Sequence, residues 1–121
     1  MIQEKIYKVL SENSEIAAIV SSRIYPVNLP KDALVPAIVY TIDEIIPIKS
    51  LAGESGIDNG TVEISCWAKD YTTAHLLATK VRSAFVAVDI GVMTGNMQDD
   101  KDEETRNYVV VIVMDILSSS A

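Results

Sequence analysis

Cys66 and His75 are the two side chains of this 121-residue sequence that could act together as a nucleophile and its base; the chain has no other cysteine or histidine. A catalytic thiol must be ionised by a neighbouring base, so the two groups would have to lie within hydrogen-bonding distance. Cys66, however, falls among the inward-facing positions of an expected strand, and His75 falls about one turn into the helix that follows. We therefore expect a buried, unreactive thiol and a solvated histidine.

An acidic run places Asp100, Asp102 and Glu104 at alternate positions, as the ligands of a calcium-binding loop are placed. The sixth position of such a loop requires glycine and the twelfth a carboxylate, but Thr105 and Val111 stand there. One cysteine and one histidine are also too few for a zinc site. We therefore predict a solvated acidic hairpin loop, and assign no metal ligand and no cofactor-binding residue.

Two further patterns could point to nucleotides or nucleic acid. Gly53-Glu54-Ser55-Gly56 lacks the Lys-Ser/Thr pair that follows in a phosphate-binding loop. Trp67 and Tyr71 could stack on bases, but Lys69 is the only basic residue beside them. The formal net charge of −7 also repels phosphate backbones. We interpret the two aromatic side chains as core or interface residues.

The hydrophobic pattern predicts one α+β domain over residues 1–121. Helical spacing is expected in an N-terminal pair, with Asn13 or Ser14 capping its second member, and in a longer helix that Asp70 caps. The apolar stripe of this longer helix, which includes Leu77, Val81 and Phe85, is expected to pack on the sheet face that holds Val62, Ile64 and Cys66. Strands are expected near residues 37–46, 61–69, 91–97 and 106–117. The expected fold is a mainly antiparallel sheet of about four strands, packed against the helical pair and the longer helix.

The segment from Pro47 to Gly60 is predicted to be a long loop, because it holds three glycines and few large apolar residues. Loops of this length are either functional or disordered. We expect the segment to be mobile in the isolated subunit and to become ordered on contact with a partner.

The last expected strand is apolar on both faces. Tyr108, Val110 and alternate residues after them form one row, while Val109, Val111 and Val113 form the other. A strand of this kind must be covered on both sides, and the predicted helices can cover only one completely. We therefore expect the valine row to pack on a neighbouring subunit. The longest apolar stretch is far too short to cross a membrane, and the charged N-terminus is unlike a signal peptide.

The order of several short motifs is similar to a known family. Arg23-Ile24-Tyr25-Pro26 follows the N-terminal helices, Pro36-Ala37-Ile38-Val39-Tyr40 comes next, and then Val62-Glu63-Ile64-Ser65-Cys66-Trp67-Ala68 precedes Asp70-Tyr71 and a helix. This arrangement resembles the tail-completion proteins of long-tailed bacteriophages and prophages, which include tail terminators and tail-to-head joining proteins. One departure is the ending Met114-Asp115-Ile116-Leu117, where many relatives close with an aromatic residue, so both roles stay open.

The resemblance implies a virion structural protein with no catalytic residues. It implies a homo-oligomeric ring, six-fold, that caps the tail tube, ends its polymerisation and meets the head connector or completion protein. Assembly would take place in the host cytoplasm, and the mature ring would lie at the head–tail junction. Six copies of −7 would carry −42, which suits a channel through which DNA passes without specific binding.

Two alternatives to this role come from other functional classes. One is a small non-viral binding module that holds a peptide along a sheet edge. The other is a small carboxylate-based enzyme that uses Asp43 with Glu63 or Glu44 for acid–base chemistry. Solvated strand faces explain these three carboxylates more simply.

Overall fold

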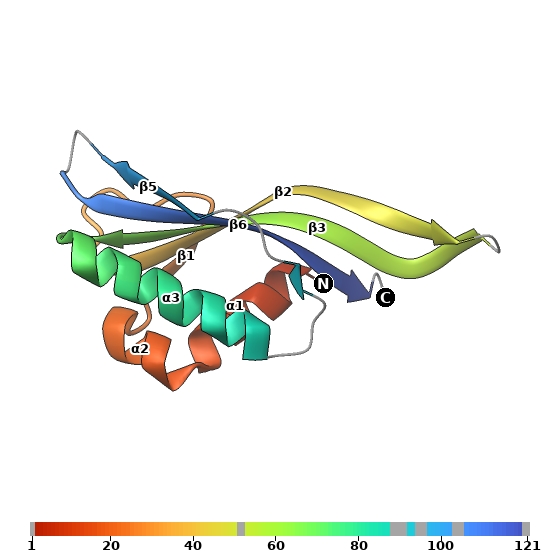
Figure 1. Cartoon of the computed structure of the whole chain (residues 1–121), viewed down its shortest axis with the longest axis horizontal. Helices are drawn as coiled ribbons and strands as arrows, with labels where there is room; N and C mark the ends of the chain where they lie inside the picture. The colour runs from red at the N-terminus through yellow and green to blue at the C-terminus, as the bar shows by residue number, and fades with distance from the viewer. Residues whose placement is uncertain (1, 51–52, 88–91, 94–96, 103–105, 120–121) are drawn as a thin grey trace.

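The computed structural model describes residues 2–50, 53–87, 92–93, 97–102 and 106–119. Within these ranges it contains three helices and six strands (Figure 1): α1 (Ile2–Glu12), α2 (Ser14–Val20), β1 (Ile24–Pro26), β2 (Ala37–Ser50), β3 (Gly53–Ala68), α3 (Tyr71–Ala87), β4 (Val92–Met93), β5 (Met97–Lys101) and β6 (Tyr108–Ser119). The α+β prediction, with its helical pair and longer helix, is confirmed. No helix in the described part of the chain is long and apolar enough to cross a membrane.

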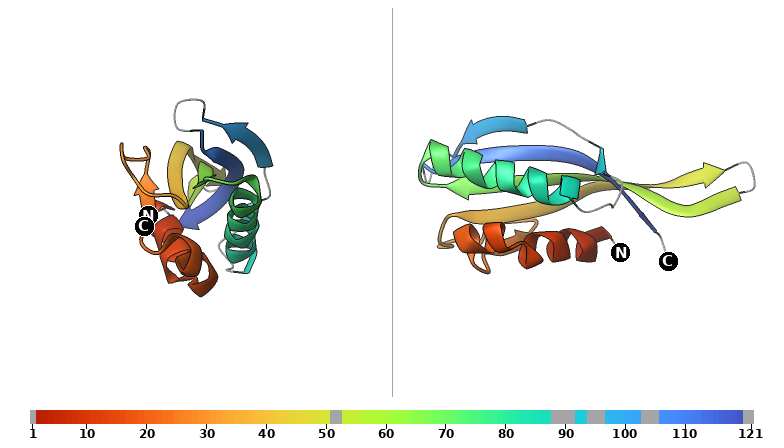
Figure 2. Two further views of the ribbon diagram at one scale, coloured as in Figure 1. Left: turned by 90° about the vertical axis from the view of Figure 1, so that its left-hand side faces the viewer. Right: turned by 60° about the horizontal axis from the view of Figure 1, so that its bottom comes forward.

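All strands belong to one sheet, in the order β1-β2-β3-β6-β4, with β5 also paired to β6. Only the β1–β2 pair is parallel, so the sheet is mainly antiparallel as predicted. The strand count exceeds the four expected, because β1 follows Arg23 as a short edge strand and because two short strands, β4 and β5, occupy the region of the single strand expected near residues 91–97. The three helices lie together on one side of the sheet, which gives two layers (Figures 1 and 2).

Both predicted helix caps are present. The side chain of Asn13 accepts hydrogen bonds from the backbone N–H groups of Glu15 and Ile16, at 3.0 and 3.1 Å. Asp70 accepts one from the backbone N–H of Thr73 at 3.0 Å, at the start of α3. Such caps satisfy N–H groups that have no partner within the helix. They fix where the two helices begin.

The core lies between the helices and the sheet. From α3, Leu77, Val81 and Phe85 are fully buried, and from β3 so are Val62, Ile64 and Cys66; all six belong to one hydrophobic cluster. The helical pair adds buried side chains from the other end of the chain: Ile6, Leu10, Ile16 and Val20. The predicted packing of the α3 stripe on this face of the sheet is confirmed.

The prediction of a long loop from Pro47 to Gly60 is wrong. The segment forms the far halves of β2 and β3, which remain paired as far as Ser50 and Gly53. Strand propensity continues through the β-branched residues that flank Pro47, and proline is tolerated because β2 is an edge strand beyond its short contact with β1. This hairpin arm, defined here as residues 46–50 and 53–59, extends past the helical layer (Figure 1).

The acidic run is also only partly a loop, since Asp99, Asp100 and Lys101 belong to β5 and pair with β6. Glu103, Glu104 and Thr105 lie outside the described residues. Charged side chains on a short edge strand discourage pairing with other chains, which explains why so polar a segment can be a strand.

The two faces of β6 differ as predicted, but the valine row is less exposed than expected. Val110, Ile112 and Met114 are buried beneath the helices. On the other face Val109 is only 6% exposed, and Val111 and Val113 are half-buried. The row therefore offers little continuous apolar surface to a neighbouring subunit.

Candidate functional site

The structure does not bring the potential nucleophile and base together. Cys66 is fully buried in the core, and this burial raises the pKa of its thiol. His75 lies on the surface of α3, where its Nε2 is 2.6 Å from Oδ1 of Asp99. A protonated, inaccessible thiol is a poor nucleophile. The prediction of a buried, unreactive cysteine is confirmed, whereas His75 is not merely solvated, because it has a specific partner.

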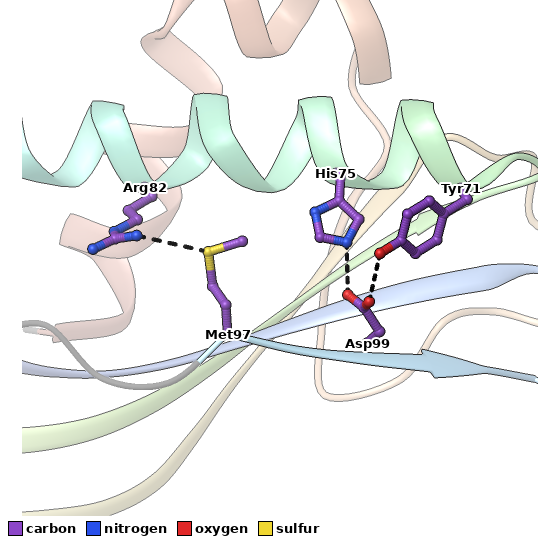
Figure 3. Close-up of polar contacts among 5 residues, drawn as sticks. All are labelled: Tyr71, His75, Arg82, Met97 and Asp99. Carbon is purple, nitrogen blue, oxygen red and sulfur yellow. Dashed lines mark hydrogen bonds and ion pairs between the residues drawn. The ribbon is translucent and has the colours of Figure 1, made fainter.

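Tyr71, His75 and Asp99 form a polar cluster that joins the start of α3 to β5 (Figure 3). The phenol of Tyr71 donates to Oδ2 of Asp99 at 2.7 Å, and the Tyr71 and His75 rings lie 4.5 Å apart. The Tyr71 hydrogen bond, and secondarily His75, hold the pKa of the Asp99 carboxyl below its usual value. The same hydrogen bond raises the pKa of Tyr71. The cluster clamps an edge strand to a helix, and its groups are too exposed for an activated catalytic set.

The amino-acid sequence alone did not reveal this cluster. A signal was present, because Tyr71 and His75 are four residues apart and so share one helix face. The partner carboxylate could not be chosen, since the acidic run offers several and only the pairing of β5 with β6 selects Asp99. Within the described residues no group of three or more His, Cys, Asp or Glu side chains could hold a metal ion.

Trp67 lies on the sheet face opposite the helices, beside a loop that crosses that end of the sheet. Its side chain and residues 29–35 line the same open hollow, together with Lys69, Asp102 and Asn107. The indole Nε1 is buried and has no hydrogen-bond partner among the described residues. Trp67 therefore lies beside this loop, in agreement with its interpretation as a core or interface residue, and the structure adds Lys31 to Lys69 as a basic residue near it.

The remainder of that face, beyond the loop, is uncovered and acidic. Cross-strand pairing places Glu44 and Asp115 opposite Thr61, and Glu63 opposite Val113. The Thr61 hydroxyl donates to Oδ1 of Asp115 at 3.0 Å. In the described side chains of residues 37–45, 60–68, 97–101 and 108–116, no lysine or arginine lies on this face. Of the carboxylates weighed for acid–base catalysis, Asp43 and Glu44 are thus exposed and Glu63 is half-buried.

The comparisons with known proteins give the context for these surfaces. The family described as tail completion protein gp17 matches residues 4–119, which is nearly the whole chain. This chain belongs to that family. It is a structural protein of phage tails and not an enzyme.

A solved structure agrees with this membership at the level of fold. A chain from the "Virion of native gene transfer agent (GTA) particle" has a TM-score of 0.73, with 94% of this chain and 91% of that chain covered. At 16% identity this similarity concerns the fold alone. No curated protein matches the sequence.

A tail completion protein acts by contacting other proteins, so the features of interest are surface features that do not contribute to its own core. The hairpin arm is one, because it extends past the helices. The acidic uncovered face is a second. The groove between α3 and β5 is a third, and it is described below. The resemblance to tail-completion proteins is confirmed, and the peptide-binding and carboxylate-enzyme alternatives lose their support.

Proposed function

We propose that this chain, as a single domain over residues 1–121, assembles into a six-fold ring at the end of the phage tail tube. The ring ends tube polymerisation and offers its other side to the head connector or completion protein. Family membership supports a role in completing the tail, and the virion source of the similar structure agrees with a place in the particle.

The hairpin arm is the observation that carries this proposal. At its tip, where Lys49 pairs with Glu54 and Ser50 with Gly53, the arm lies beyond the last described pair of β3 with β6, which is Ile57 with Ser119, so the described tip has two strands. A two-stranded hairpin without a packed face is marginally stable in water. A partner that packs on such an arm would stabilise it, and the exposed end of a tail tube could be this partner.

The acidic uncovered face suits the DNA channel of such a ring. Packing it on an identical copy would bury Glu63 and Asp115 against further carboxylates with no cation to pair them. Burying unpaired charges costs several kcal/mol per ion. We infer that the central part of this face, around Glu63 and Asp115, borders the channel and repels the DNA backbone, and that neighbouring subunits meet at the edges of the sheet.

A shortened arm tests the proposal. Ile45 and Gly60 are paired, so residues 46–59 can be replaced by Asn-Gly, which forms a tight two-residue hairpin turn. The described members of the core cluster, among them Ile64, Val81 and Phe85, all lie outside the removed segment, so the variant should fold. Tube growth from purified tail-tube protein should stop when wild-type protein is added and should continue with the variant. A folded variant that stops growth as well as wild type would refute a role for the arm.

A further inference from the structure

A groove between α3 and β5 carries an arginine, Arg82, that has no acidic partner among the described residues. Thr79, Arg82, Ser83, Val86 and Met97 line this groove, and Val86 is 67% exposed. The only hydrogen bond of the Arg82 guanidinium among the described residues runs from Nη1 to the Met97 sulfur at 4.0 Å (Figure 3). A thioether is a weak acceptor. The carboxylate of Asp99, on the same strand as Met97, is already bound by Tyr71 and His75.

The opposite edge of the sheet carries carboxylates for which the described part of the chain provides no basic partner. β1 pairs with β2 only as far as Tyr40, so β2 is a free edge from Thr41 onward. The register shifts between Ile42 and Glu44, which sets Asp43 in a bulge. Asp43 and Glu44 are exposed and make no ion pair among the described residues, and Ile45 beside them is 47% exposed. This edge therefore presents the carboxylate of Glu44 toward the uncovered face and the apolar side chain of Ile45 toward the helix face, with Asp43 in the bulge beside them.

We propose that the Asp43–Ile45 edge of one subunit docks into the α3–β5 groove of the next copy, an inference that rests on the proposed ring. Arg82 pairs with Asp43 and Glu44 of the neighbour, and Ile45 packs near Val86. A planar guanidinium suits carboxylate pairing at an interface. Each surface thus supplies what the other lacks, in charge and in apolar area.

The positions of the two surfaces fit a closed ring. They lie on opposite edges of the sheet, as a head-to-tail contact requires, since the donating surface differs from the accepting one. The groove and the Asp43–Ile45 edge also lie at nearly the same position along the direction of β6. Met97, in the groove, pairs with Ile112 of β6. Glu44, at the other edge, is opposite Thr61 of β3, which in turn is opposite Asp115 of β6. Ile112 and Asp115 are three residues apart. Three strand residues span about 10 Å, which a modest tilt between subunits accommodates.

Charge reversal tests the contact through assembly of the full-length protein. Arg82→Glu, and separately Asp43→Lys with Glu44→Lys, should each raise the concentration at which rings form by about tenfold or more, because like charges then face each other. A chain carrying all three substitutions should regain assembly. So should an equimolar mixture of the two variants, in which the subunits alternate around the ring. An alternating ring closes only with an even number of subunits, and six is even.

The measurement is sedimentation velocity, together with negative-stain microscopy on tail tubes, after thermal unfolding has shown that each variant is folded. Lys31→Glu and Glu12→Lys are the matched controls, since both residues are exposed and lie on neither surface. Restored rings in the combined chain and in the mixture support the contact. Normal rings from either reversed variant overturn it, as does a folded combined chain that does not assemble.

Two other outcomes separate this contact from the proposed function. If Arg82→Glu still forms rings but no longer binds tubes, the groove receives the tube protein. The inference is then wrong, and the proposed function stands. If the wild-type protein forms no ring, alone or on tubes, both are wrong.

Discussion

Phe85→Ala removes the largest fully buried side chain and so tests how firmly α3 is held to the sheet. The phenyl ring of Phe85 lies within the core cluster that also contains Leu77, Val81 and Ile64. Deleting a fully buried phenylalanine costs about 3–5 kcal/mol, because the lost burial adds to the cost of the cavity left behind. The total stability of a domain of this size is about 5–15 kcal/mol, so the variant should be folded but marginal.

The assay is urea unfolding followed by circular dichroism. With a slope of about 2 kcal/mol per molar urea, the midpoint should fall by about 2 M. Val86→Ala is the control, since its side chain is adjacent in sequence but 67% exposed, and it should change stability by less than about 0.5 kcal/mol. A loss below about 1 kcal/mol for Phe85→Ala, or an equal loss for both variants, would show that α3 does not pack as described.

Three further predictions concern chemistry, pH and the uncovered face. Cys66→Ala combined with His75→Ala should leave ring formation and tube capping intact apart from a packing cost; a folded double variant that cannot assemble would restore the nucleophile hypothesis. Because the pKa of Asp99 is lowered in the folded protein, its contacts stabilise the fold at neutral pH. This stabilisation is lost as the pH falls below the ordinary aspartate pKa of about 4 and through the lowered pKa of Asp99. Asp99→Asn should therefore flatten that part of a plot of unfolding free energy against pH, and an unchanged plot would contradict the cluster. Val113→Asp should leave ring assembly unchanged, because its face borders the channel; loss of rings from a folded variant would show instead that subunits meet there.

The sequence predicted those parts of the fold in which local pattern and burial agree. The α3 stripe, the caps at Asn13 and Asp70 and the alternation of β3 are each determined by neighbouring residues, and all appear as expected. The inert thiol of Cys66 followed from the same alternation. In these elements the neighbouring residues alone determine the structure, so the sequence was sufficient to predict them.

The errors share a physical cause, which is that cross-strand pairing overrode local composition. Residues 47–60 contain three glycines and a proline, yet the ladder between β2 and β3 continues through them. Asp99 to Lys101 are polar, yet they pair with β6. The two proposed docking surfaces, the α3–β5 groove and the Asp43–Ile45 edge, could not be predicted from the sequence for a similar reason. No sequence pattern distinguishes Arg82 and Asp43, and only the tertiary fold shows that neither has an oppositely charged partner among the described residues.

The most direct test of the central claim is to image tail tubes grown with the wild-type protein present. The account predicts a single ring at one end of each tube, bare tube walls, and a mean tube length that falls as the protein is added earlier. Tubes that keep growing at saturating protein, with no density at either end, would contradict it.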